Sequence, residues 1–187
     1  WRSTLGRSDG RLARNEVLDE ARRAEGLRPL SDRNNTEEIR LISRLRPIRG
    51  LHVLDVGAGH GWFLEAAVLA GARAEGLEPD EAIAESARAR GLGVTTGYFP
   101  ETLPAGSRFD VISFHDVLEH IPDVAGALSA CREHLRPKGL LVVSAPDAAG
   151  TLFWVARVLT SVGIAGPLER LWQRGYPSPH VSYFDRR

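Results

Sequence analysis

Residues 51–61 read Leu-His-Val-Leu-Asp-Val-Gly-Ala-Gly-His-Gly, and this stretch contains the strongest signal of the fold. Its apolar first half predicts a short buried strand over residues 51–56, and glycines at alternate positions follow the strand. Glycines allow a tight turn and let backbone N–H groups approach a ligand at the start of a helix. The stretch therefore predicts a strand, a ligand-binding turn and an apolar helix over about residues 61–70.

The same alternation of strand and helix continues along the chain. Apolar runs predict further strands over residues 73–77, 93–96, 109–114 and 139–144, and helical patterns cover about residues 79–90 and 124–135. Strands that alternate with long helices form βαβ units and a parallel sheet. The predicted fold class is α/β, a Rossmann-like doubly wound, mostly parallel sheet with helices on both faces. Ligands of such sheets bind beyond the carboxyl ends of the strands.

The segment before residue 51 is polar and arginine-rich. It predicts one helix over about residues 11–25, ended by Gly26 and Pro29, and a second that begins at Thr36, a good N-cap residue, and ends near Leu45. After residue 150, two apolar helical stretches predict core packing or a cover for a substrate.

Composition and charge exclude several classes of protein. A chain of 187 residues with 43% apolar and 26% charged residues is typical of one soluble domain. The single cysteine, Cys131, excludes a disulfide framework, and no apolar run is long enough to cross a membrane. No signal peptide is recognisable, so a cytoplasmic protein is expected. Residues 51–150 carry 7 basic and 14 acidic side chains, a net charge of −7, which argues against a nucleic-acid partner.

An acidic residue, Glu78, ends the second predicted strand. A carboxylate there is placed to accept hydrogen bonds from both hydroxyls of a ribose. The glycine spacing is Gly-x-Gly-x-Gly, whereas dinucleotide-binding proteins have Gly-x-Gly-x-x-Gly, and Trp62 stands where their third glycine would be. The pattern favours a nucleoside ligand over a nicotinamide or flavin dinucleotide.

Residues 54–61 resemble the nucleotide-binding motif of class I S-adenosylmethionine-dependent methyltransferases. The resemblance continues through Glu78, residues 109–123 and residues 135–143, in the family's order, and covers about residues 45–145. It is strongest to the small-molecule branch that includes the ubiquinone-biosynthesis O-methyltransferases. The resemblance implies S-adenosyl-L-methionine as the cofactor and a small-molecule methyl acceptor, with a hydroxyl oxygen as the expected acceptor atom.

The resemblance also implies roles for individual residues. The methionine part of the cofactor would face Asp55, Gly57, Gly59 and Gly61, Glu78 would hold the ribose, and Pro79 and Phe99 would line the adenine. His115 would lie beside the sulfonium and is the candidate base, since an imidazole takes a proton near neutral pH. His180 is expected on the substrate side.

A metal site is a weaker alternative after the fourth predicted strand. Asp116, Glu119 and His120 share one face of a helical turn, and some ubiquinone-type enzymes bind a divalent metal with such residues. Two acids and one histidine without a fourth ligand make a weak site. No metal is therefore expected, and ordering of the loop before Pro122 is the other interpretation.

The expected organisation is one methyltransferase domain over residues 1–187. It comprises an N-terminal helical cap (1–50), a cofactor-binding core (51–145) and a helical insertion or substrate-side segment (146–187). The family fold has two more strands, the last antiparallel, so C-terminal strands are expected to be missing from this chain. A non-catalytic cofactor-binding or scaffolding module is the alternative function, and a nicotinamide-dependent reductase is a second. The oligomeric state is not predicted.

Overall fold

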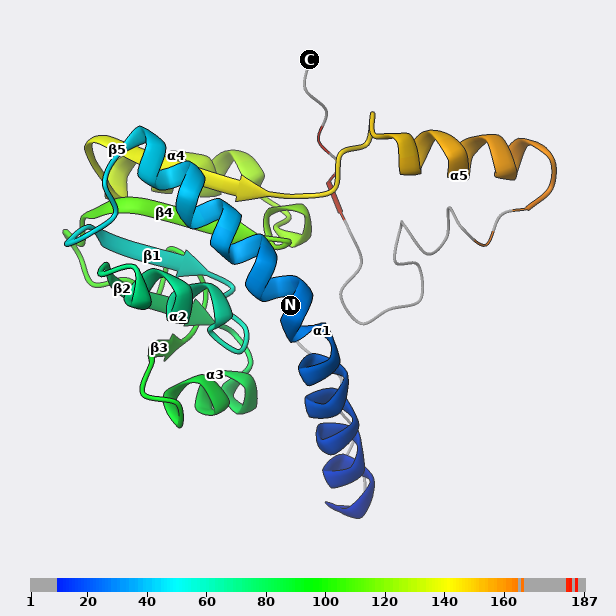
Figure 1. Ribbon diagram of the computed structural model, residues 1–187, viewed down its shortest axis with the longest axis horizontal. Coiled ribbons are helices and arrows are strands. Elements are labelled where there is room, and N and C mark those ends of the chain that lie inside the picture. The colour runs from blue at the N-terminus through cyan, green and yellow to red at the C-terminus, as the bar shows by residue number, and fades with distance from the viewer. Residues whose placement is uncertain (1–9, 165, 167–180, 183, 185–187) are drawn as a thin grey trace.

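The computed structural model describes residues 10–164, 166, 181, 182 and 184. Its centre is one sheet with the strand order β3-β2-β1-β4-β5, and every pairing is parallel (Figure 1). The strands are β1 (His52–Val56), β2 (Arg73–Glu78), β3 (Gly93–Thr96), β4 (Phe109–His115) and β5 (Leu135–Ser144). The predicted parallel α/β fold is confirmed.

The helices cover both faces of this sheet. They are α1 (Gly10–Leu45), α2 (Trp62–Leu69), α3 (Glu81–Arg88), the short 3-10 helix η1 (Leu118–His120), α4 (Val124–His134) and α5 (Thr151–Ser161). In Figure 1, α5 follows β5 and extends away from the sheet. Among the described residues, no helix combines the length and the apolar character needed to cross a bilayer.

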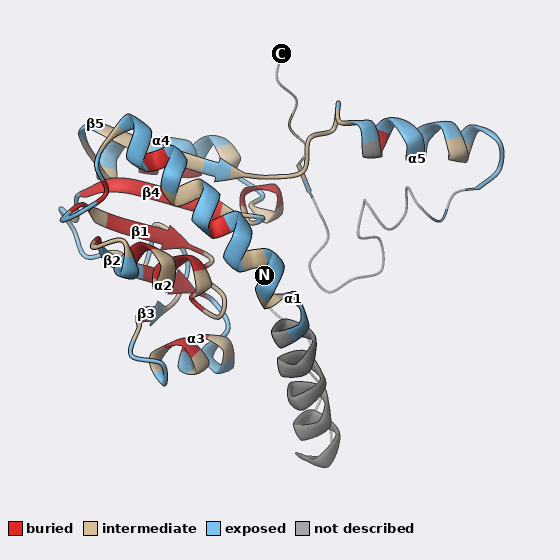
Figure 2. Cartoon of the chain, in the orientation of Figure 1, coloured by how far each residue is buried: buried red, intermediate tan, exposed pale blue. Residues whose placement is uncertain are grey.

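Neighbouring residues of each central strand pack into different layers of the core. Val53 and Val111 join a cluster with Ile42 of α1 and Phe63 of α2. Leu54, Ile112 and Phe114 join a second cluster with Ala127 and Cys131 of α4. Figure 2 shows β1 and β4 buried along their length. Because both faces are covered, these strands are continuously apolar rather than alternating.

One long helix replaces the two predicted in the N-terminal segment. Pro29 lies inside α1, and the Thr36 hydroxyl donates to the carbonyl of Asp32 at 2.7 Å rather than capping a new helix. Proline costs about 3 kcal/mol in a helix interior. Tertiary contacts offset this cost, since Arg28 pairs with Glu65 of α2 and Ile42 is buried against the sheet.

The strand β5 begins four residues earlier than the sequence predicts. Phe109 pairs with Leu135 but Val111 pairs with Leu140, so the ladder contains an irregularity between the two pairs. Within it, Lys138 adopts a positive φ of 62°. Such a bulge adds residues to one strand without breaking the pairing on either side.

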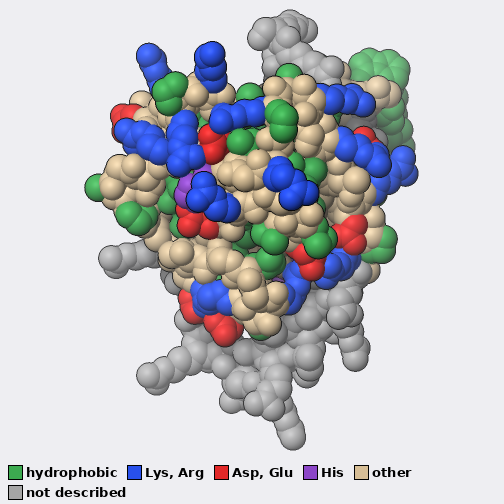
Figure 3. Space-filling view, turned by 60° about the vertical axis from the view of Figure 1, so that its left-hand side comes forward, with side chains coloured by type: hydrophobic (Ala, Val, Ile, Leu, Met, Phe, Trp, Pro, Cys, Tyr) green, Lys and Arg blue, Asp and Glu red, His purple; other side chains and the backbone are tan. Residues whose placement is uncertain are grey.

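A buried carboxylate, Asp110, connects several segments of the chain at the end of the sheet where the strands begin. It is 5% exposed, lies 2.9 Å from the Arg46 guanidinium and 2.6 Å from that of Arg136, and accepts the backbone N–H of His52 at 2.9 Å. Burial by itself would raise the pKa of Asp110, but the His52 N–H and the Arg136 charge outweigh it and hold the pKa below its ordinary value. The view that brings this side of the molecule forward shows many Lys and Arg side chains (Figure 3).

Candidate cofactor-binding site

The sequence-predicted glycine turn lies at the carboxyl end of the sheet, where the strand order reverses between β1 and β4. A crevice at such a point is where open α/β sheets bind ligands. A cavity of about 260 Å³ lies there. Its lining includes Asp55 of β1 and Gly57, Ala58 and Gly59 of the following turn, His115 at the end of β4 and Asp116 after it, and Ser31, Asn34, Asn35 and Glu38 of α1.

The three glycines of the turn all have a positive φ but serve different purposes. A Cβ atom at Gly57 would lie 2.4 Å from Cγ2 of Val117, and one at Gly61 would lie 2.5 Å from Cδ1 of Leu92. A Cβ at Gly59 would meet nothing within 4 Å, although Gly59 lines the cavity. Gly57 and Gly61 are therefore required by packing, whereas Gly59 leaves open space on the side where a ligand would lie.

Substitutions at two of these glycines should separate folding from binding. Gly59→Ala should lower the free energy of unfolding by only about 1 kcal/mol, which is the cost of an alanine in the left-handed conformation. It should raise the dissociation constant of S-adenosylmethionine about tenfold, because the added methyl group would occupy space that the ligand needs. Gly57→Ala adds a clash with Val117 and should lower the free energy of unfolding by about 3 kcal/mol. Urea unfolding and calorimetry measure the two effects. Equal losses of stability in both variants would contradict this division.

Glu78 connects the glycine turn to the turn after β2. Its side chain is buried, and its two carboxylate oxygens accept the backbone N–H groups of Gly59 and Asp80, both at 2.9 Å. A carboxylate has about four acceptor positions, so two remain for the hydroxyls of a ribose. Glu78 does not itself line the 260 Å³ cavity. The carboxylate that is predicted to bind the ribose therefore lies next to the cavity and is hydrogen-bonded to the glycine turn that lines it.

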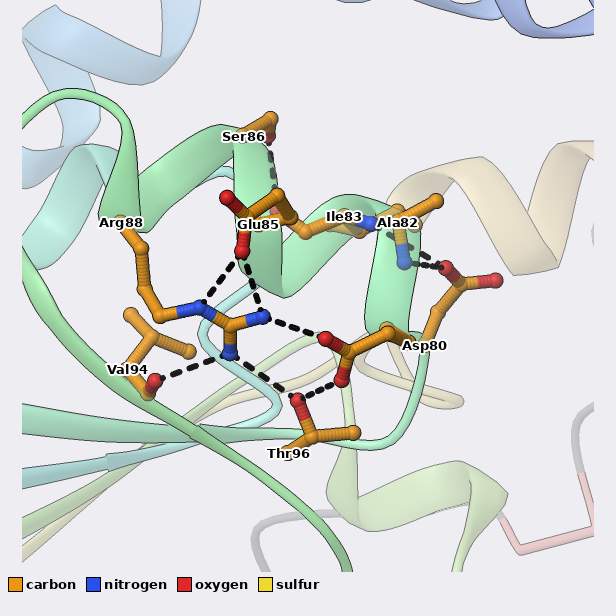
Figure 4. Close-up of polar contacts among 9 residues, drawn as sticks. Asp80, Ala82, Ile83, Glu85, Ser86, Arg88, Val94 and Thr96 are labelled. Atoms are coloured by element: carbon orange, nitrogen blue, oxygen red, sulfur yellow. Dashed lines mark hydrogen bonds and ion pairs between the residues drawn. The ribbon is translucent and has the colours of Figure 1, made fainter.

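Polar contacts order the adjoining end of α3 and β3, which Figure 4 shows. The Asp80 carboxylate accepts the N–H groups of Ala82 and Ile83 and so caps α3. Arg88 at the end of α3 reaches Glu81 and Glu85 on its own helix and the Thr96 hydroxyl at the end of β3. These contacts order the turn between Glu78 and α3 and connect α3 to the end of β3.

The residues predicted to line the adenine are not brought to the cavity. Pro79 is exposed between Glu78 and the cap residue Asp80. The Phe99 ring packs edge-on at 5.7 Å from the Phe114 ring and 6.2 Å from that of His134, in the apolar layer under α4. Phe99 is half-buried and packs against the core, so its predicted contact with the adenine stays a prediction.

His115 lies between two carboxylates. Its Nδ1 is 3.0 Å from Oε2 of Glu38, and its Nε2 is 3.6 Å from Oδ1 of Asp55, which accepts the Ser113 hydroxyl at 2.9 Å. The Phe63 ring lies 4.2 Å from the imidazole. The two predicted site residues Asp55 and His115 thus meet, together with a residue of α1 that the sequence analysis did not identify.

The charges of this cluster are strongly coupled. Burial raises the pKa of Asp55 from 3.8 to about 6, although His115 and the Ser113 hydroxyl work in the opposite direction. Burial also works to lower the pKa of His115, but the contact with Glu38 and the charge of Asp55 outweigh it and raise that pKa. The pKa values of Asp55 and His115 are therefore both raised, and each depends on the charge of the other.

The loop after β4 does not gather the residues of the alternative metal site. Glu119 is 1% exposed, neither of its carboxylate oxygens has a hydrogen-bond partner, and burial raises its pKa. Its backbone carbonyl accepts the N–H groups of Val181 and Ser182. Within the described ranges, no three His, Cys, Asp or Glu side chains are grouped as metal ligands would be. His180, expected on the substrate side, lies outside the described residues.

A signal for the missed residues was present in the sequence. Asn34 and Asn35 lie three and four residues after Ser31 and four and three residues before Glu38, so the four side chains form a polar stripe on α1. Ile39 and Ile42 lie next to this stripe and pack on the sheet. The predicted helix break at Pro29 and the predicted cap at Thr36 divided the stripe and concealed it.

A larger hollow of about 730 Å³ lies elsewhere, beside the start of β5. Its walls include Arg108, Arg132, Arg136 and Lys138, and it touches none of the residues that the sequence assigns to the cofactor. Since ligands of parallel sheets bind at the carboxyl ends, the smaller cavity is the candidate site.

Comparison with known proteins shows the family to which the chain belongs. The chain matches the methyltransferase domain family over residues 24–187. A ubiquinone biosynthesis O-methyltransferase of Rhizobium leguminosarum is 37% identical over 106 residues, which cover 53% of this chain and 42% of that protein. The chain thus spans less than half the length of that curated relative.

Solved structures show the same arrangement. An S-adenosylmethionine-dependent methyltransferase from Mesorhizobium loti is 30% identical, with a TM-score of 0.51 over 60% of this chain and 54% of that one. A sugar N-methyltransferase from Streptoalloteichus is 25% identical, with a TM-score of 0.61 over 81% of this chain and 60% of that one. The resemblance found in residues 45–145 is confirmed, and the chain belongs to the methyltransferase domain family.

Proposed function

We propose that this chain binds S-adenosyl-L-methionine at the glycine turn and transfers its methyl group to a hydroxyl oxygen of a small molecule. The observation that carries the proposal is the position of the cavity. It lies at the carboxyl ends of β1 and β4, beside Gly59, where an added Cβ atom would meet nothing within 4 Å. Glu78 lies next to it, and two of its acceptor positions are not used by the Gly59 and Asp80 N–H groups. The name of the Rhizobium relative, an O-methyltransferase, supports oxygen as the acceptor atom.

The charges that line the cavity support this cofactor over a dinucleotide. Its ionisable lining residues are Glu38, Asp55, Asp116, His60 and His115, and no Lys or Arg from the described part of the chain joins them. Carboxylates attract the sulfonium and ammonium groups of S-adenosylmethionine and repel the pyrophosphate of a nicotinamide dinucleotide. The electrostatics and the glycine spacing therefore favour the same ligand.

The cofactor supplies the reactive methyl group, so the protein's work is binding, alignment and exclusion of water. Glu78 would hold the ribose, and the glycine turn would hold the methionine part. Asp55 and Glu38 would balance positive charge at the cavity wall. His115 also lines the cavity and is the candidate base for the proton of an acceptor hydroxyl. This division of work needs no nucleophile on the protein.

An amine nitrogen is the second candidate acceptor. The Streptoalloteichus relative, a sugar N-methyltransferase, covers 81% of this chain, more than the O-methyltransferase of Rhizobium does. An oxygen or a nitrogen atom would attack the methyl carbon of the cofactor by the same in-line displacement, so the cofactor site does not distinguish the two acceptors. The acceptor must be identified from the product.

Thermal unfolding with different ligands tests the proposal. S-adenosylmethionine and S-adenosylhomocysteine at about 100 times their dissociation constants should each stabilise the folded protein by about 2.7 kcal/mol, whereas NADH should not. Incubation with a panel of small alcohols, phenols and amines should then release S-adenosylhomocysteine, and mass spectrometry of the product identifies the methylated atom. Absence of any stabilisation would overturn the proposed cofactor, and binding without turnover would favour the non-catalytic module.

A further inference from the structure

The helix α1 forms one wall of the cavity with polar side chains only. The stripe consists of Ser31, Asn34, Asn35 and Glu38. Among these four residues, only Glu38 is charged, and only Glu38 forms an ion pair with a residue on the opposite wall, which is His115. Its side chain is 20% exposed, less than half the value for the neighbouring Glu37 on the same helix, which is 58% exposed and pairs with Arg40. Among the acidic side chains of α1 that the structure describes, Glu38 is thus the one that lines the site.

The contact between Glu38 and His115 determines which nitrogen of the imidazole is available. Nδ1 lies 3.0 Å from Oε2 of Glu38, a buried oxygen that has no other hydrogen-bond partner, so a proton on Nδ1 would have this carboxylate within reach. A neutral imidazole with its proton on Nδ1 can only accept a proton at Nε2. Nε2 is buried, has no hydrogen-bond partner and faces Asp55 at 3.6 Å.

We propose that Glu38 is a positioning residue for His115, which holds the ring with Nδ1–H towards α1 and Nε2 towards Asp55 and the glycine turn. The inference rests on the proposed function, because it concerns the histidine that would serve the methyl acceptor. A carboxylate that fixes the tautomer and orientation of a histidine is a common device of sites that move protons. Here the carboxylate comes from α1 and the histidine from the end of β4.

The surroundings of His115 leave Glu38 as the group that orients it. The charged groups that act on the ring are Glu38 from α1, Asp55 from β1 and Asp116 after β4. Phe63 of α2 packs against the ring at 4.2 Å and offers it no hydrogen bond. Asp55 is occupied by the Ser113 hydroxyl and lies 0.6 Å farther from its nitrogen than Glu38 does from its own (3.6 against 3.0 Å).

The tautomer of His115 can be measured directly. Protein with isotope-labelled histidine nitrogens is examined by NMR at alkaline pH, where the imidazole is neutral, and the His115 signals are assigned by their absence from His115→Asn. We expect protonated Nδ1 in the wild type. Glu38→Gln should keep this signature, because an amide oxygen at the same position can accept a proton from Nδ1. Glu38→Ala should lose it, and so should Glu38→Asp, whose side chain is one methylene too short.

A matched control and an independent measurement complete the test. Glu37→Ala removes the same charge from an exposed position of α1 and should leave the His115 signals unchanged. Unchanged signals in Glu38→Ala and Glu38→Asp would overturn the inference, as would their loss in Glu38→Gln, because charge rather than hydrogen bonding would then orient the ring. Calorimetry of the wild type with S-adenosylmethionine tests the proposed function separately. Absent binding with an intact tautomer signature would reject the function alone.

Discussion

Glu78→Ala should raise the dissociation constant of S-adenosylmethionine about 100-fold, a loss of about 2.7 kcal/mol. The expected effect is large because the carboxylate would accept from both ribose hydroxyls, and hydrogen bonds to a charged group contribute about 1.5–3 kcal/mol each. The same substitution frees the N–H groups of Gly59 and Asp80, so the glycine turn also loses its tie to β2. Isothermal calorimetry well below the unfolding temperature measures the dissociation constant.

Two further variants make the result specific to Glu78. Glu75→Ala removes a carboxylate from the same strand, but that side chain is 50% exposed and pairs with His52 away from the cavity. It should leave the dissociation constant unchanged. Glu78→Gln keeps one acceptor oxygen without the charge and should raise the constant about tenfold. A Glu78→Ala protein that is folded and binds as tightly as the wild type would remove Glu78 from the site.

Asp110→Ala should lower the free energy of unfolding by about 3 kcal/mol. The substitution leaves the His52 N–H without its acceptor and two guanidinium groups without their shared counter-charge, and breaking a buried pair typically costs about 3–5 kcal/mol. Because Arg46 and Arg136 are 36% and 39% exposed, water compensates part of this loss. Urea unfolding at neutral pH measures the difference.

The effect of Asp110 should depend on pH in a defined direction. Its pKa is lower in the folded protein than the ordinary value of 3.8, so ionisation stabilises the fold above that value. The difference between wild type and Asp110→Ala should therefore be constant near neutral pH and decrease as the pH falls below 3.8 and through the folded pKa. Glu133→Ala, an exposed change at the same end of the sheet, should cost less than about 0.5 kcal/mol. A loss of stability as small as this in Asp110→Ala would show that the contacts of Asp110 with Arg46, Arg136 and His52 do not stabilise the fold.

The strands and most helices were predictable because their signals are local. Gly93–Thr96 was predicted with the bounds that the structure shows, and the apolar runs of β1 and β4 were predicted to within one residue at each end. The N-terminal segment was predicted wrongly for the opposite reason. Pro29 and Thr36 are signals of helix ends within the chain itself, whereas the contacts that continue α1 come from Glu65 and from the sheet.

The alternation of strand and helix, the glycine turn and the acidic residue at the end of β2 could be predicted from the sequence, because each depends on neighbours along the chain. The packing of Phe99 against the core and the position of His115 between Glu38 and Asp55 could not, because they depend on the tertiary structure. Glu38, His115 and Asp55 lie on α1, β4 and β1, and their distances depend on how α1 packs across the sheet. No local pattern encodes that packing, since burial of Ile42 and Phe63 in one shared cluster is what sets it.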